Sequence, residues 1–174
     1  MTPSETAGAP PRSALALETR SPAQTRELAA TLAGAARPGD RLALIGPLGA
    51  GKTQFAKGFA AGLGVSDVVN SPSFTLMAEY AGRLPLFHQD LYRLGGAVDA
   101  IAGGLFDERQ DAGVTLSEWA DRLESGFDPV RLEVHFTVLG DDERRIELVA
   151  PEGSHYERYV DAAAAWEPDP ERSR

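Results

Sequence analysis

Residues 41–53 read RLALIGPLGAGKT, and this stretch decides the fold. Arg41–Ile45 has the apolar composition of a short buried strand, and a helix is expected to begin at Lys52. The glycines, Lys52 and Thr53 match the Gly-x4-Gly-Lys-Thr pattern of a phosphate-binding P-loop. In such a loop, backbone N–H groups turn towards an anion at a helix N-terminus, the lysine reaches the β- and γ-phosphates, and the threonine hydroxyl binds Mg²⁺.

Strand and helix patterns alternate on both sides of this loop. Strand-like segments are expected at residues 15–18, 41–45, 74–80, 84–88, 114–116, 130–138 and 144–149. Helical segments are expected at about residues 21–36, 52–63, 97–102 and 154–165. This order predicts an α/β, P-loop NTPase-like domain of three layers, in which helices flank a mostly parallel central sheet and an antiparallel hairpin lies at the flank.

Length and composition predict one soluble domain. Of the 174 residues, 1–13 and 167–174 are expected to form a disordered leader and tail around a domain at 14–166. Cysteine is absent, which excludes a disulfide scaffold, a cysteine nucleophile and iron–sulfur ligation. No long apolar run or signal-peptide pattern is found, so we expect a cytoplasmic protein without a membrane partner.

Charge limits the direct partners of the chain. It carries 17 Lys and Arg against 26 Asp and Glu, a formal net charge of −9. Such a protein repels the phosphates of a nucleic acid, so any RNA is expected to be bound mainly by another protein.

Two carboxylates are candidates to hold Mg²⁺ beside the P-loop. Asp90 and Glu118 each come at the end of an expected strand, and α/β proteins bind ligands at the carboxyl edge of the sheet. Guanine recognition commonly uses an Asn-Lys-x-Asp loop. Because the only asparagine, Asn70, is followed by Ser71, this loop is excluded and ATP is the expected nucleotide.

Three further segments follow the P-loop in order: SPSFTL at 71–76, HQDLYRL at 88–94 and SEW at 117–119. With GAGKT at 49–53 they resemble the TsaE family, small bacterial P-loop ATPases of tRNA threonylcarbamoyladenosine synthesis, over about residues 15–150. The resemblance implies a Mg²⁺-dependent ATPase that is slow alone and stimulated by the partners TsaB and TsaD. It implies that tRNA is met only indirectly, through that complex.

The resemblance also implies roles for individual residues. Thr53 and Glu118 are associated with Mg²⁺ in the family, and Asp90 lies at the same phosphate end. The expected metal ligands are therefore Thr53, Glu118 and Asp90, and the expected catalytic residues are Lys52, Glu118 and Asp90. Ser73 stands where the family usually has a threonine that senses the γ-phosphate. The expected nucleotide contacts are Gly46, Leu48, Gly49, Ala50, Gly51, Lys52, Thr53, Gln54 and Ser73.

Two other functions remain open on the sequence. A compact P-loop protein also suits a small-molecule kinase, although such enzymes usually carry an arginine-rich lid and the arginines here are scattered. A nucleotide-gated interaction module with little turnover would also use the loop. Near the expected site, His88 is expected to orient or pack rather than act as a base, and Trp119 to pack beside the nucleotide.

Overall fold

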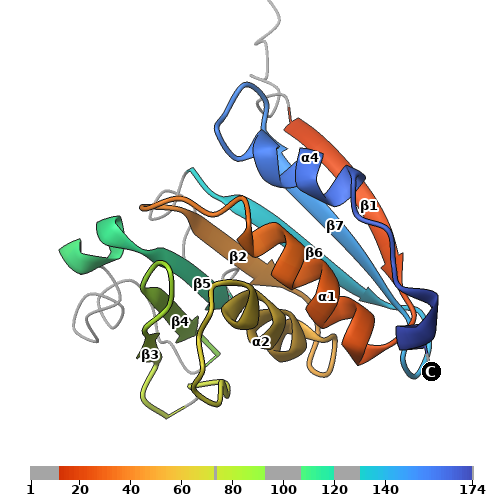
Figure 1. Ribbon diagram of the computed structural model, residues 1–174, viewed down its shortest axis with the longest axis horizontal. Coiled ribbons are helices and arrows are strands. Elements are labelled where there is room, and N and C mark those ends of the chain that lie inside the picture. The colour runs from red at the N-terminus through yellow and green to blue at the C-terminus, as the bar shows by residue number, and fades with distance from the viewer. Residues whose placement is uncertain (1–11, 73, 93–106, 120–129, 174) are drawn as a thin grey trace, which may run out of the picture.

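The computed structural model describes residues 12–72, 74–92, 107–119 and 130–173, and within them seven strands form one sheet (Figure 1). The strands are β1 Arg12–Thr19, β2 Arg41–Ile45, β3 Met77–Tyr80, β4 Leu86–Asp90, β5 Val114–Glu118, β6 Leu132–Val138 and β7 Arg144–Pro151. The helices are α1 Pro22–Ala33, α2 Lys52–Gly62 and α4 Glu157–Ala164, with short 3₁₀ helices η1 Glu108–Ala112 and η3 Pro170–Ser173. None of these helices has the length and apolar character needed to cross a lipid bilayer.

The sheet is mixed, with the order β1-β7-β6-β2-β5-β4-β3. The central strands β6, β2, β5 and β4 are parallel, and β1, β7 and β3 join the edges through antiparallel pairings. The α/β class and the β6–β7 hairpin are confirmed. The expectation of a mostly parallel sheet holds only for the centre, where β4 and β5 are buried along their whole length.

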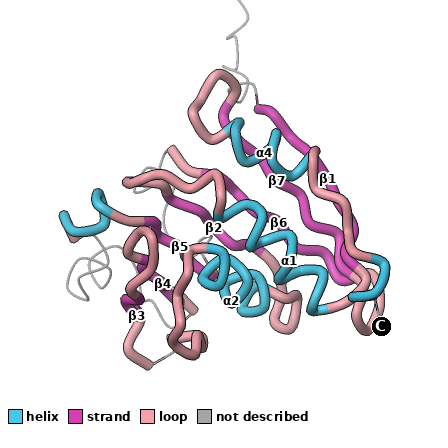
Figure 2. The backbone as a smooth tube through the Cα atoms, in the orientation of Figure 1, coloured by secondary structure: helices cyan, strands magenta, loops and turns pink. Residues whose placement is uncertain are grey.

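The three α-helices lie together against the sheet (Figure 2). Ser21 caps α1 by accepting a hydrogen bond from Gln24 N, as its sequence predicts. Helices α1 and α2 pack very closely, because a Cβ atom on Gly58 would lie 2.2 Å from the Arg26 carbonyl oxygen. Since α1 contacts both α2 and α4, the described residues show one helical layer. The helix expected at 97–102 lies outside the described residues.

The core between α2 and the sheet anchors the start of that helix. Phe55 and Phe59 of α2 are fully buried, and their rings lie 6.2 Å apart. Phe55 also makes an edge contact, at 5.7 Å between centroids, with Phe136 of β6. This packing orients the first turn of α2 at the carboxyl end of β2.

Several boundaries differ from the sequence-based expectation. β1 begins at Arg12, two residues before the expected domain start at 14, because Arg12 already pairs with Pro151. β4 covers 86–90 rather than 84–88, since Pro85 lacks the N–H group that a ladder residue donates. β3 begins only at Met77, after Leu76 takes a positive φ of 64°. Part of the expected tail, Pro170–Ser173, forms η3 against α1.

Candidate nucleotide-binding site

The P-loop connects β2 to α2, and its glycines are required by geometry. A Cβ atom on Gly46 would lie 2.9 Å from Phe136 Cβ, so no larger residue fits there. Gly51 has a φ of 100°, a conformation that side chains other than glycine rarely adopt. Lys52 is the first residue of α2, which places the loop at a helix N-terminus.

Lys52 is buried above its own loop. Its Nζ donates hydrogen bonds to the carbonyl oxygens of Gly46, at 2.5 Å, and Pro47, at 2.9 Å. The same Nζ lies 3.9 Å from the centroid of the Trp119 ring, within the range of a cation–π interaction. Trp119 therefore packs beside the loop and helps to hold the ammonium group over it.

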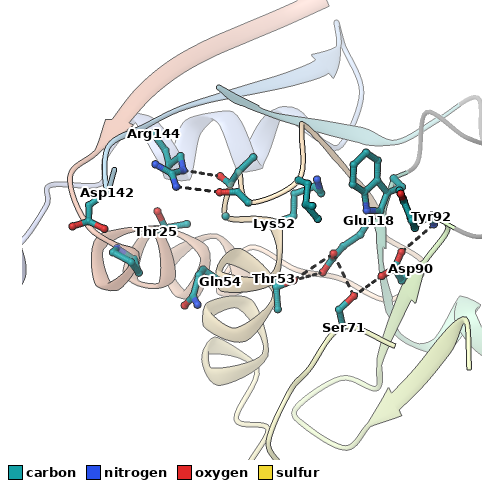
Figure 3. A pocket seen from close by; sticks show the side chains of 16 residues that line it. Thr25, Lys52, Thr53, Gln54, Ser71, Asp90, Tyr92, Glu118, Asp142 and Arg144 are labelled. Atoms are coloured by element: carbon teal, nitrogen blue, oxygen red, sulfur yellow. Dashed lines mark hydrogen bonds between the residues drawn. The ribbon is translucent and has the colours of Figure 1, made fainter. Parts of the chain in front are cut away.

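Glu118 and Thr53 face each other across the site (Figure 3). Glu118 is the last residue of β5, and only 3% of its surface is exposed. The Thr53 hydroxyl lies 3.2 Å from Glu118 Oε1 and 3.4 Å from Oε2. A hydroxyl and a carboxylate thus meet beside the loop lysine, from segments 65 residues apart in the chain.

Asp90 lies beside Glu118 because the parallel register pairs these two residues. The Ser71 hydroxyl donates to Asp90 Oδ2 at 2.5 Å and also lies 3.5 Å from Glu118 Oε2. The backbone N–H of Tyr92 donates to Asp90 Oδ1 at 3.0 Å. Ser71 therefore connects the two carboxylates. Ser73, the other hydroxyl expected here, lies outside the described residues.

His88 supports Glu118 from within the sheet. Its side chain is fully buried, and Nε2 lies 2.8 Å from Glu118 Oε1. Nδ1 is buried without a hydrogen-bond partner among the described residues. A proton on Nε2 fits this geometry because it is donated to the carboxylate, whereas a proton on Nδ1 would be a buried N–H without an acceptor. In this arrangement His88 orients Glu118.

These groups border a cavity of about 530 Å³. It is lined by Pro22, Thr25, Leu48, Gly49, Ala50, Gly51, Lys52, Thr53, Gln54, Ser71, Asp90, Tyr92, Glu118, Trp119, Asp142 and Arg144. Of the expected nucleotide contacts that are described, only Gly46 does not line the cavity; its carbonyl oxygen accepts a hydrogen bond from Lys52. Gln54 lines it with its Oε1 held by Arg26 Nη1 at 2.6 Å.

Sequence reasoning did not select Pro22 or Thr25, and of the other lining residues Asp142 and Arg144 it offered only the surrounding turn, Gly140–Arg144, as a weak candidate to border the adenine. These four residues come from the start of α1 and from the β6–β7 turn, and no motif marks them. The sequence does indicate Ser71, because Pro72 restricts it to an extended backbone from which its hydroxyl, like those of Ser73 and Thr75, could reach a phosphate or a Mg²⁺-bound water.

The donor atoms suit Mg²⁺ that arrives with a phosphorylated ligand. Mg²⁺ prefers oxygen ligands and is usually bound by one or two carboxylates together with substrate phosphates. Thr53, Asp90 and Glu118 supply such oxygens beside the loop. Within the described ranges, no cluster of three or more His, Asp or Glu side chains forms a complete metal site.

The fold and the site together define a protein of the P-loop NTPase-like class. The comparisons with known proteins agree and narrow the assignment. The family model described as "Threonylcarbamoyl adenosine biosynthesis protein TsaE" matches residues 19–146. The chain therefore belongs to the TsaE family.

Individual relatives show how far the similarity extends. A tRNA threonylcarbamoyladenosine biosynthesis protein TsaE from Bacillus subtilis (strain 168) is 45% identical over 140 residues, which are 80% of this chain and 87% of the relative. A TsaE protein from Treponema pallidum (strain Nichols) is 40% identical over 110 residues, 63% of this chain and 82% of the relative. The crystal structure of Bacillus subtilis YdiB superposes with a TM-score of 0.69 at 39% identity, covering 90% of this chain and 97% of that one.

Proposed function

We propose that the chain is a Mg²⁺-dependent ATPase that acts with TsaB and TsaD in the synthesis of tRNA threonylcarbamoyladenosine. One observation is the main support for ATP hydrolysis at this site. The hydroxyl of Thr53, the last residue of the P-loop motif, lies 3.2 Å from the buried carboxylate of Glu118. Both residues and the P-loop lysine, Lys52, line the cavity described above. Membership of the TsaE family supports the proposal that this ATPase activity serves tRNA threonylcarbamoyladenosine synthesis.

Each group has a chemical task in this proposal. The loop amides and Lys52 bind the phosphates, and Lys52 exchanges its two carbonyl acceptors for phosphate oxygens. Thr53, Glu118 and Asp90 hold Mg²⁺, which when bound neutralises phosphate charge. His88 keeps Glu118 turned towards Thr53 through its Nε2 proton. Ser71 holds Asp90, and Ser73 is the hydroxyl that we assign to the γ-phosphate.

The charge of Glu118 supports a bound cation. Its hydrogen-bonding partners are the hydroxyls of Thr53 and Ser71 and the ring of His88. Among the described residues, no lysine or arginine forms an ion pair with it. A buried carboxylate that lacks a compensating positive charge is costly, and a divalent cation removes that cost.

Exposed apolar side chains beside the cavity support a protein partner. Leu48 of the P-loop, which lines the cavity, is 86% exposed. Tyr92, which lines the cavity, is 50% exposed. Large exposed apolar side chains are typical of surfaces that bind another protein. Because the chain has a net charge of −9, we assign tRNA binding to the partners.

The test compares the two lysines of the chain. ATP hydrolysis is measured with Mg²⁺ and with TsaB and TsaD present, for the wild type, Lys52→Ala and the matched control Lys57→Ala. We expect Lys52→Ala to reduce turnover by about 100-fold or more, because it removes a preorganised charge on the phosphates. Lys57 does not line the cavity, and its variant should retain full turnover.

Two results would overturn the proposal. Unchanged turnover in Lys52→Ala would show that hydrolysis does not occur at this loop. Transfer of phosphate to a sugar or nucleoside, independent of TsaB and TsaD, would identify the chain as a small-molecule kinase instead.

A further inference from the structure

Arg144, the first residue of β7, lines the cavity and contacts the backbone of the P-loop. Its Nε donates to the Ala50 carbonyl oxygen at 3.1 Å, and its Nη2 donates to the Gly49 carbonyl oxygen at 3.1 Å (Figure 3). Two adjacent carbonyls of the loop are thus held by one planar side chain. Arginine suits this task because its donors form a rigid fork.

The remaining nitrogen of the guanidinium binds the β6–β7 turn. Nη1 lies 2.8 Å from the carbonyl oxygens of Gly140 and Glu143 and 3.2 Å from that of Asp141. One side chain therefore joins this turn to a loop that lies 94 residues earlier in the chain. The turn is in this way a structural support of the P-loop.

These contacts fix the direction of a loop amide. In a trans peptide, the carbonyl of one residue and the N–H of the next point in opposite directions, and no peptide bond in the described chain is cis. Holding the Ala50 carbonyl towards Arg144 therefore turns the Gly51 N–H to the opposite side, where an anion would bind. Gly49 and Gly51 have φ of 75° and 100°, and glycine is conformationally permissive, so support from outside the loop reduces the entropy lost on binding.

Arg144 also adds positive charge to the cavity. Among the described residues that line the cavity, Lys52 and Arg144 are basic, and Asp90, Glu118 and Asp142 are acidic. In the described part of the chain Arg144 forms no ion pair with a carboxylate, and carbonyl oxygens are its acceptors. Its charge is therefore available to an anionic ligand.

We propose that Arg144 is a positioning residue that orients the P-loop amides for the β-phosphate of a nucleotide. The proposal rests on nucleotide binding at this loop, which is part of the proposed function. It assigns a role to the β6–β7 turn, which the P-loop motif does not include. The effect is expected in affinity for a diphosphate, because AMP lacks the phosphate that this part of the loop would bind.

Calorimetric titration with ADP–Mg²⁺ and with AMP tests the proposal. The variants are Arg144→Gln, which removes the charge and the fork, and Arg144→Lys, which keeps the charge alone. Arg145→Gln is the matched control, because Arg145 is 55% exposed and pairs with Glu18 at 3.6 Å, away from the loop. Unfolding temperatures of the nucleotide-free proteins are measured in parallel.

We expect Arg144→Gln to weaken ADP binding by about tenfold, from the loss of charge-assisted hydrogen bonds, and Arg144→Lys by a smaller factor. AMP binding and the control should stay within about twofold of the wild type. An equal loss for ADP and AMP, or no loss for ADP, would overturn the proposal. If Arg144→Gln does not fold, the loss of ADP affinity relative to the loss of AMP affinity is measured for Arg144→Lys instead, and the same criteria apply. If the wild type binds neither nucleotide, the proposed function itself fails.

Discussion

Both ends of the central strands bury a carboxylate, but the two carboxylates have different partners. At the carboxyl end, Glu118 contacts two hydroxyls and an imidazole and borders a cavity. At the amino end, just before β2, Asp40 binds the guanidinium of Arg158 and the hydroxyl of Tyr159, the latter at 2.5 Å. The backbone N–H of Arg37 also donates to Asp40, at 2.9 Å.

The difference shows that the partners of a buried carboxylate, rather than its burial, indicate its role. Asp40 has a cationic partner and several donors, so it fixes α4 to the sheet. Burial, and then its bond to Asp40, raise the pKa of Tyr159 above its ordinary value, so the phenol stays a donor. Glu118 has no lysine or arginine partner among the described residues and instead borders the cavity, where we propose that it holds Mg²⁺.

The largest effect is expected at the amino end. Asp40→Ala removes the acceptor of the buried Tyr159 hydroxyl and the carboxylate that pairs with Arg158, and should lower the free energy of unfolding by about 3–5 kcal/mol. Urea unfolding measures this loss. The control Asp161→Ala, at an exposed position on α4, should change it by less than about 0.5 kcal/mol. If Asp40→Ala lowers the free energy of unfolding no more than the control does, Asp40 is not a structural carboxylate, and the contrast with Glu118 is lost.

Glu118→Gln should show the opposite pattern. Turnover of ATP is expected to fall by about 100-fold, because a ligand of the metal is lost. The free energy of unfolding should stay the same or rise, since the substitution removes a buried charge that no lysine or arginine pairs with in the described part of the chain. Turnover assays check the expected loss of activity, and urea unfolding checks the expected stability. A loss of stability comparable to that of Asp40→Ala would show that Glu118 is mainly structural.

A smaller effect is expected at His88, which acts through Glu118. His88→Leu should lower turnover by about tenfold and raise the Mg²⁺ concentration needed for half-maximal activity, as removal of a supporting hydrogen bond does at metal sites. His88→Gln retains a donor near the position of Nε2. It should recover part of the turnover and part of the lost response to Mg²⁺. Equal behaviour of the two variants, with unchanged Mg²⁺ dependence, would limit His88 to packing.

The smallest effect is expected at Glu133, a carboxylate of β6 with cationic partners near the surface. Burial acts to raise its pKa, but the hydrogen bond from His135 and the charges of Arg12 and Arg131 outweigh it, so the pKa of Glu133 lies below its ordinary value. Its contribution to stability is therefore complete above the unfolded-state pKa and is lost as the pH falls through the lower folded-state pKa.

Glu133→Gln should accordingly cost less than about 1 kcal/mol at pH 7. The cost should shrink as the pH is lowered through the acidic range, which urea unfolding at a series of pH values measures. A cost that grows towards low pH would contradict the direction of the pKa shift. Relative to Asp40, this variant separates an ion pair near the surface from a buried one.

Much of the site could be predicted because its signals are local. The P-loop requires glycine backbone conformations, a lysine and a hydroxyl within eight consecutive positions, 46–53, and the structure places them at the start of α2. Asp90 and Glu118 were expected after their strands. They are instead the last residues of β4 and β5, because Pro85 delays the start of β4 and the register then pairs Asp90 with Glu118.

Other features needed contacts between distant segments. The motif around residue 52 predicts a phosphate site, because its glycines, lysine and hydroxyl all lie within a few consecutive positions of the sequence. Only the folded chain brings the Arg144 fork to the loop carbonyls and places Thr53 against Glu118, because these pairs are separated by 94 and 65 residues. Patterns in the sequence indicate local backbone structure, whereas these two long-range contacts depend on how helices and strands pack together.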